Sequence, residues 1–180
     1  GIITEVVDWD NASIDWSRYS MAIVRSPWDY HRRYPEFLAW LDSVSTATTL
    51  QNSADIIRWN TNKEYLAELV EAQIGVIPTT FVRSAEDLVT ITNEGMLERD
   101  IVVKPTISAG SNNTERHEES PVKAAAHLGF LLDAGFVAIV QPYQRFIDER
   151  GETGMVIRYI KNKIPPLAAL GLPPVLRSKA

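Results

Sequence analysis

Residues 101–114 read Ile-Val-Val-Lys-Pro-Thr-Ile-Ser-Ala-Gly-Ser-Asn-Asn-Thr. The short apolar run at the start is typical of a buried strand, and Lys104 stands where that strand ends. The residues beyond it are mostly small, so backbone N–H groups and the hydroxyls of Ser108, Ser111 and Thr114 can approach an anion. The stretch therefore predicts a strand that carries a lysine into a phosphate-binding loop. A surface hairpin with an exposed lysine is the alternative interpretation.

Two well-known glycine-rich nucleotide motifs are absent from this sequence. No Gly-Lys-Ser/Thr follows the loop, and no Gly-x-Gly-x-x-Gly occurs anywhere in the chain. The loop is therefore neither a P-loop nor a dinucleotide fingerprint.

Helices and strands alternate around this loop. Apolar spacing and capping residues predict helices over 62–70, from Ser84, and over 121–132, while apolar runs predict strands at 76–82, 136–140 and from 155. Residues 107–120 are expected to form a polar loop. The buried face of the third helix is expected at Val122, Ala125, Leu128, Leu131 and Leu132.

The first quarter of the chain predicts a parallel βαβ unit. Residues 2–7 form an apolar run, residues 21–24 read as a buried strand, residues 34–44 have helical spacing, and residues 48–50 suggest another strand. We expect an α/β or α+β protein with a boundary near residue 56.

Two segments after the loop carry side chains suited to a nucleoside. Gln141 and the backbone around Tyr143 follow an apolar strand and could bind the edge of an adenine ring. Asp148 or Glu149 could hold ribose hydroxyls. The alternatives are a strand that ends at a turn proline and an ordinary charged turn.

Two basic residues before the loop are further candidates. Lys63 opens a predicted helix and could reach a phosphate, although a solvated helix lysine is the commoner explanation. Arg25 follows the strand at 21–24, where open α/β sheets bind ligands, and could hold a carboxylate in a forked pair. A structural turn around a half-buried tryptophan explains that segment equally well.

Composition excludes several classes of protein. The chain has no cysteine, so it has no disulfide, zinc–thiolate site or thiol nucleophile. A net charge of −5 argues against general nucleic-acid binding, and no apolar stretch is long enough to span a membrane. We expect a cytoplasmic protein. All acidic residues lie at or before Glu152, so the end of the chain is basic. This basic end is either a solvated tail or a tail that binds a partner.

The three histidines predict no metal site, because no metal-ligand spacing joins them. His127 lies inside a predicted helix, where packing or solvation explains it better than ligation. His117 follows the loop and is at best a weak candidate.

Six segments in this order resemble the ATP-grasp superfamily, and within it the RimK- and glutathione-synthetase-like ligases, including the O-ureido-D-serine cyclo-ligases. The resemblance extends over residues 5 to 157. Its segments are RSPWDYH (25–31), RWNTNKEYL (58–66), GVIPTTFV (75–82), VVKPTISAGS (102–111), VQPYQ (140–144) and GETGMV (151–156).

The resemblance implies an ATP-dependent carboxylate–amine ligase that works through an acyl phosphate and uses ATP, Mg²⁺ and a small carboxylate or amino-acid-like substrate. It implies a partial pre-ATP-grasp domain over residues 1–55, a nucleotide-binding region over 56–157 and an atypical tail over 158–180. By this resemblance, Lys63 and Lys104 would hold the ATP phosphates, and the loop with Ser108, Gly110 and Ser111 would close over them. Gln141 and Tyr143 would bind adenine, and Asp148 or Glu149 would bind ribose. Arg25 would line the site of the acceptor substrate.

The sequence departs from the family at both ends. The family's magnesium ligands are an Asp or Glu and a later Glu-x-Asn, and no carboxylate side chain follows Glu152 here. The family's first strand also has no counterpart. We therefore expect the metal ligands outside the region that resembles the family. A non-catalytic nucleotide-binding module or a truncated fragment is the alternative.

Overall fold

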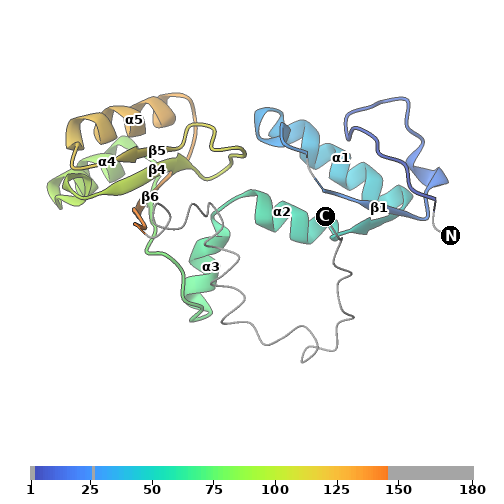
Figure 1. Ribbon diagram of the computed structural model, residues 1–180, viewed down its shortest axis with the longest axis horizontal. Coiled ribbons are helices and arrows are strands. Elements are labelled where there is room, and N and C mark those ends of the chain that lie inside the picture. The colour runs from blue at the N-terminus through green and yellow to red at the C-terminus, as the bar shows by residue number, and fades with distance from the viewer. Residues whose placement is uncertain (1–2, 26, 146–180) are drawn as a thin grey trace. The chain divides into compact units, whose positions relative to one another are not determined.

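The computed structural model describes residues 3–25 and 27–145, which lie almost wholly in a compact unit formed by Gly1–Tyr143 (Figure 1). Its first part is the predicted βαβ unit. Strand β1 (Met21–Ile23) pairs in parallel with β2 (Thr49–Gln51), and helix α1 (Tyr34–Ala47) connects them. Two short 3-10 helices, η1 (Trp16–Arg18) and η2 (Tyr30–Arg32), precede α1.

Helix α1 supplies most of the core of this part. Phe37, Leu41 and Val44 are fully buried, at the spacing that places residues on one helix face. They pack with Leu50 of β2 and Ile57 of the next helix. A cluster of aromatic rings packs against this core: the rings of Trp9, Tyr30 and Trp40 contact Phe37, and the ring of Trp16 contacts Trp40.

Two helices lead from β2 to the second sheet. Helix α2 (Ala54–Thr61) begins at Ser53, whose hydroxyl accepts the N–H of Ile56. Helix α3 (Tyr65–Glu71) follows after a short interruption.

The second sheet has four antiparallel strands in the order β3-β6-β4-β5. Figure 1 shows helices α4 and α5 on one side of it, where they bury a second apolar cluster. The central strands β4 (Ile101–Pro105) and β6 (Ala138–Pro142) are longer than the edge strands β3 (Thr80–Val82) and β5 (Glu115–His117). The remaining elements are α4 (Ala85–Asn93), η3 (Met96–Glu98) and α5 (Pro121–Asp133).

Local sequence explains where the helices of this part begin and end. Helix α4 starts with a capping box, in which Ser84 accepts the N–H of Asp87 and the Asp87 carboxylate accepts the N–H of Ser84. Helix α5 has Pro121 at its start and ends at Gly135, which adopts φ +80°.

Several sequence-based expectations are wrong in detail. Residues 3–7 form no strand, and Ile3 and Val6 are almost fully exposed. Strand β1 is largely exposed rather than buried. The segment 107–120 is not all loop, because it contains β5. Helix α5 buries Ala124, His127, Leu128 and Leu131, whereas Val122 is 81% exposed. The strand expected from Met155 lies outside the described residues.

Within residues 3–25 and 27–145, no helix has the length and apolar character needed to cross a membrane.

Candidate functional site

Two lysines from separate segments meet beside the loop that follows β4. Lys104 lies in β4 and Lys63 lies between α2 and α3; both side chains are partly buried. The backbone N–H of Lys63 donates to the carbonyl of Thr106 at 3.0 Å, which fixes the α2–α3 connection against the end of β4. Lys104 is therefore partly buried and close enough to Lys63 for their charges to interact, which argues against the alternative of a surface hairpin with an exposed lysine.

Burial weakens the charged form of both lysines, and the charge of Lys104 weakens that of Lys63 further. Desolvation, and then the positive charge of Lys104, lower the pKa of Lys63 to about 8. Desolvation also lowers the pKa of Lys104. Among the residues described, no carboxylate raises either pKa. Two neighbouring partly buried cations without an acidic partner in this region form a site with unbalanced positive charge, which favours an anion.

The loop between β4 and β5 is a long hairpin connection closed by two overlapping turns. Asn112 N–H donates to Ala109 O, and Thr114 N–H donates to Ser111 O. Gly110, Ser111 and Asn113 have φ of +60°, +60° and +51°. Positive φ at both central residues of the first turn matches the twist of a β-hairpin, so Gly110 suits this position.

The base of the loop is fixed by Lys63. Its ammonium donates to Thr106 O, Ser108 O and Ser108 Oγ, each at 3.1 Å. Thr106 is buried, and its N–H donates to Val137 O at 2.9 Å. Ser108 therefore connects the loop to the lysine that the sequence assigned to phosphate, while Gly110 and Ser111 lie exposed at the tip.

Contacts that sequence reasoning did not anticipate reach the loop from η2. The Tyr30 hydroxyl donates to Ser108 O at 3.4 Å, and Asn112 Nδ2 lies 2.9 Å from His31 Nε2. Both η2 residues belong to the RSPWDYH segment, whose aromatic residues are conspicuous in the sequence. No local pattern, however, identifies the loop as their partner.

The predicted adenine residues are close to the end of β6, but their side chains have other partners. Gln141 is buried and its amide donates to Thr79 Oγ1 at 2.7 Å. The Arg116 guanidinium lies 3.6 Å from the centroid of the Tyr143 ring, and Tyr143 N–H donates to Asp100 O. Arg116 also makes a two-pronged ion pair with Asp100. One face of the Tyr143 ring is therefore covered by a cation.

Arg25 is exposed directly beyond β1. In the same segment, Asp29 accepts from Trp9 Nε1 at 2.9 Å and from Arg33 Nη2 at 2.7 Å, which lowers the pKa of its carboxyl. The structure thus gives this segment a structural ion pair and leaves Arg25 at the surface. Asp148 and Glu149 lie outside the described residues.

Comparison with known proteins identifies relatives of this chain. Residues 1–52 match the family model described as the N-terminal domain of D-cycloserine synthetase DcsG. The cycloserine biosynthesis protein DcsG of Streptomyces lavendulae is 37% identical over 160 residues, covering 86% of this chain and 54% of that protein. The crystal structure of D-cycloserine synthetase DcsG superposes with a TM-score of 0.74 at 36% identity, covering 84% of this chain and 52% of that one. The chain is therefore similar to DcsG over most of its own length.

The chain has the mixed helix and strand architecture that its sequence predicted. It spans about half the length of the relatives it matches. A RimK domain protein of ATP-grasp type from Sphaerobacter thermophilus also matches, with a TM-score of 0.46 at 15% identity, over 70% of this chain and 46% of that one. Arg25 lies within the matched N-terminal domain.

Proposed function

We propose that this chain is the nucleotide-binding part of an ATP-dependent carboxylate–amine ligase that activates its carboxylate as an acyl phosphate. The observation that carries the proposal is the meeting of Lys63 and Lys104 beside the loop over residues 106–114, where two partly buried ammonium groups have no carboxylate to offset them in the described region. A triphosphate supplies the missing negative charge.

ATP supplies the phosphoryl group that turns a carboxylate into a good acyl donor, and the protein's task is positioning and charge neutralisation. Lys63 and Lys104 hold the phosphate oxygens. Gly110 and Ser111, at the tip of the loop, lie over them and exclude water. Lys63 donates all three of its ammonium protons to the base of this loop, so in this proposal a bond to phosphate replaces one of these bonds and the others keep the loop in place.

The other assignments follow the family resemblance. The backbone near Tyr143 binds adenine, and Gln141 supports it by joining β6 to β3 through Thr79. Asp148 or Glu149 binds ribose. Arg25 binds the carboxylate of a small amino-acid-like substrate. We assign no Mg²⁺ ligand to this chain, since the family's ligands follow the matched region.

The relatives' name narrows the substrate class. Both DcsG matches are described as proteins of cycloserine synthesis, so we propose a small amino-acid derivative as the carboxylate substrate. Ring closure, in which the nucleophile and the carboxylate belong to one molecule, is then the simplest form of the reaction.

Calorimetry of the 180-residue chain with a non-hydrolysable ATP analogue and Mg²⁺ tests nucleotide binding. We expect saturable binding that Lys63→Gln and Lys104→Gln each weaken roughly ten- to hundredfold, since each loses a hydrogen bond to a charged group worth about 1.5–3 kcal/mol. Lys123→Gln, which removes the same charge from the exposed side of α5, is the matched control and should leave the affinity unchanged.

Equal effects of all three substitutions would mean general charge attraction and would contradict the assigned site. Release of ADP in the presence of amino acids tests ligation separately. Binding without ADP release, even in a longer form that carries a magnesium site, would favour a non-catalytic nucleotide-binding module.

A further inference from the structure

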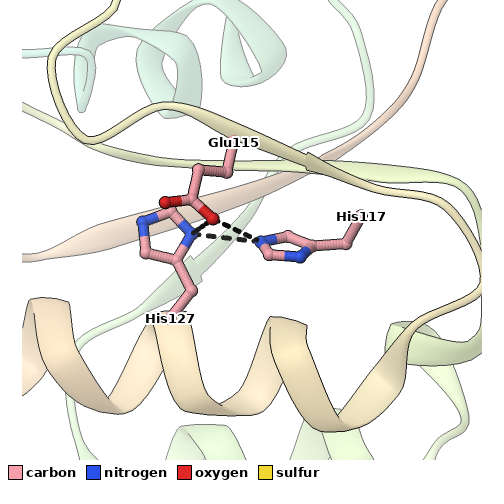
Figure 2. A group of neighbouring side chains, drawn as sticks. All are labelled: Glu115, His117 and His127. Carbon is pink, nitrogen blue, oxygen red and sulfur yellow. Dashed lines mark hydrogen bonds and ion pairs between the residues drawn. The ribbon is translucent and has the colours of Figure 1, made fainter.

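Two histidines and a glutamate converge between β5 and α5 (Figure 2). Glu115 and His117 are two residues apart on β5 and therefore extend from the same face of the strand. His127 lies in the middle of α5. His117 Nε2 is 3.1 Å from His127 Nδ1, and Glu115 Oε2 is 3.9 Å from each nitrogen. No sequence spacing joins these residues, because it is the pairing of β5 with β4 that brings them to the helix.

The two imidazoles are buried, whereas the carboxylate faces solvent. The side chains of His117, His127 and Glu115 expose 4%, 6% and 61% of their area. His127 shares the buried face of α5 with Ala124, Leu128 and Leu131 of the apolar cluster. Burial, followed by the neighbouring His127, lowers the pKa of His117.

A hydrogen bond between the two rings explains only part of this arrangement. It accounts for the 3.1 Å approach of the nitrogens. It does not account for Glu115, whose 3.9 Å separation from both nitrogens is too long for a hydrogen bond. Ligand atoms bound tetrahedrally at 2.0–2.1 Å lie about 3.3–3.4 Å apart. The nitrogens are close to that spacing, and the exposed Glu115 side chain reaches it by a small rotation.

We propose that Glu115, His117 and His127 bind a divalent transition-metal ion of the zinc class. Two imidazoles and one carboxylate suit Zn²⁺, whereas Mg²⁺ requires oxygen ligands. Three protein ligands leave a fourth position on the solvent side for water. Binding replaces the hydrogen bond between the rings, and the imidazole that donated it changes tautomer, so that its proton moves to its other ring nitrogen.

The site uses none of the residues assigned to nucleotide, but it lies at one end of the same loop. β5 begins directly after residue 114, so an ion shared by β5 and α5 fixes the end of the loop opposite to Lys104. Edge strand and helix are then joined by metal–ligand bonds as well as by packing.

The test is titration of the untagged 180-residue chain with Zn²⁺ by calorimetry and with Co²⁺ by visible spectroscopy. We expect one ion per chain and the strong d–d absorption of tetrahedral Co²⁺. Removing even an outer-shell partner costs ten- to hundredfold in metal affinity, so Glu115→Gln, His117→Gln and His127→Gln should each cost about a hundredfold. Glu118→Gln, the same change at an exposed neighbour, should have no effect.

The histidine variants alter buried side chains, so circular dichroism must show that they fold. Two measurements test the metal site without the histidine variants. Glu115→Gln changes only an exposed side chain, and imidazole ¹⁵N NMR of the unaltered chain reports on each histidine ring. Zn²⁺ should shift the His117 Nε2 and His127 Nδ1 signals and leave His31 unchanged. Affinity unaffected by Glu115→Gln, unshifted ring signals, or the absence of saturable binding would each overturn the proposal.

Discussion

At the scale of single residues, the candidate site depends on ammonium groups that the fold makes easier to deprotonate. Lys63 was chosen from the sequence because it opens a helix, and Lys104 because it ends a strand. What the sequence could not supply was their proximity, since 40 residues and several elements separate them. The bond from Lys63 N–H to Thr106 O is a tertiary contact that no local pattern encodes.

The lowered pKa of Lys63, about 8, makes phosphate binding dependent on pH. Phosphate binds the charged ammonium, and this form is lost as pH rises through 8, so affinity for an ATP analogue should fall by up to tenfold per pH unit above that value. Below the pKa, the affinity should level off. Bound phosphate raises the pKa again, so binding near pH 8.5 takes up protons.

Calorimetry in buffers of different ionisation enthalpy measures this proton uptake. In Lys63→Arg the guanidinium keeps its charge, so the pH dependence should flatten to the part that Lys104 contributes. Parallel pH profiles for the two proteins would show that Lys63 does not titrate on binding.

At the scale of elements, a short segment forms a strand only where a neighbouring strand pairs with it. β5 has the sequence Glu-Arg-His, which no strand pattern would select, and exists because it pairs with β4. Residues 3–7 contain three apolar side chains but pair with none of the described strands and form no strand themselves. The start of helix α4, by contrast, was predicted from the sequence, because its capping box lies within four consecutive residues.

Ser84→Ala should destabilise the protein by about 1 kcal/mol, because the N–H of Asp87 loses its acceptor at the start of α4. For a chain of this size the melting temperature should fall by about 2–4 °C in calorimetry or circular dichroism. Ser43→Ala, at an exposed position inside α1, is the control and should not lower it. A similar fall in both proteins would contradict the assigned cap.

Gly110→Ala and Gly129→Ala should shift stability in opposite directions. Neither added methyl group meets an atom within 4 Å, so backbone conformation alone decides. Gly110 has φ +60°, where an L-residue costs roughly 1 kcal/mol, while Gly129 lies inside α5, where alanine gains about the same amount.

Urea unfolding of both variants measures the difference. Shifts of the same sign would mean that the loop is free to leave its left-handed conformation. Loss of ATP-analogue affinity in Gly110→Ala alone would further support the role of this loop in nucleotide binding.

At the scale of the whole molecule, the class of fold was predictable and several details were not. The parallel βαβ unit and helices α1, α4 and α5 follow from apolar spacing and caps. The antiparallel order β3-β6-β4-β5 does not, since the pairings of β6 with β3 and with β4 join segments far apart in the sequence. The buried face of α5 differs from the expected one because His127 has a buried partner and therefore tolerates the core. The boundary near residue 56 and the tail from residue 158 stay predictions.

The corrected face of α5 has a direct test in Leu128→Ala and Val122→Ala. Leu128 is fully buried in the second apolar cluster, so its truncation should cost about 2–5 kcal/mol, from lost burial and the cavity that remains. Val122 is 81% exposed, and its truncation should change stability by less than about 0.5 kcal/mol. Denaturant unfolding measures the stability of both variants. Comparable losses of stability would mean that Val122 is buried in the core after all.

The lengths of the strands in the second sheet affect how copies of the chain meet one another. Its two five-residue strands are central, and each edge strand has only three residues. The edge strand β5 also carries Glu115 and Arg116, whose side chains are exposed. A short, charged edge is a poor template for a further strand, so the sheet resists extension by a second chain and the growth of β-aggregates from this end.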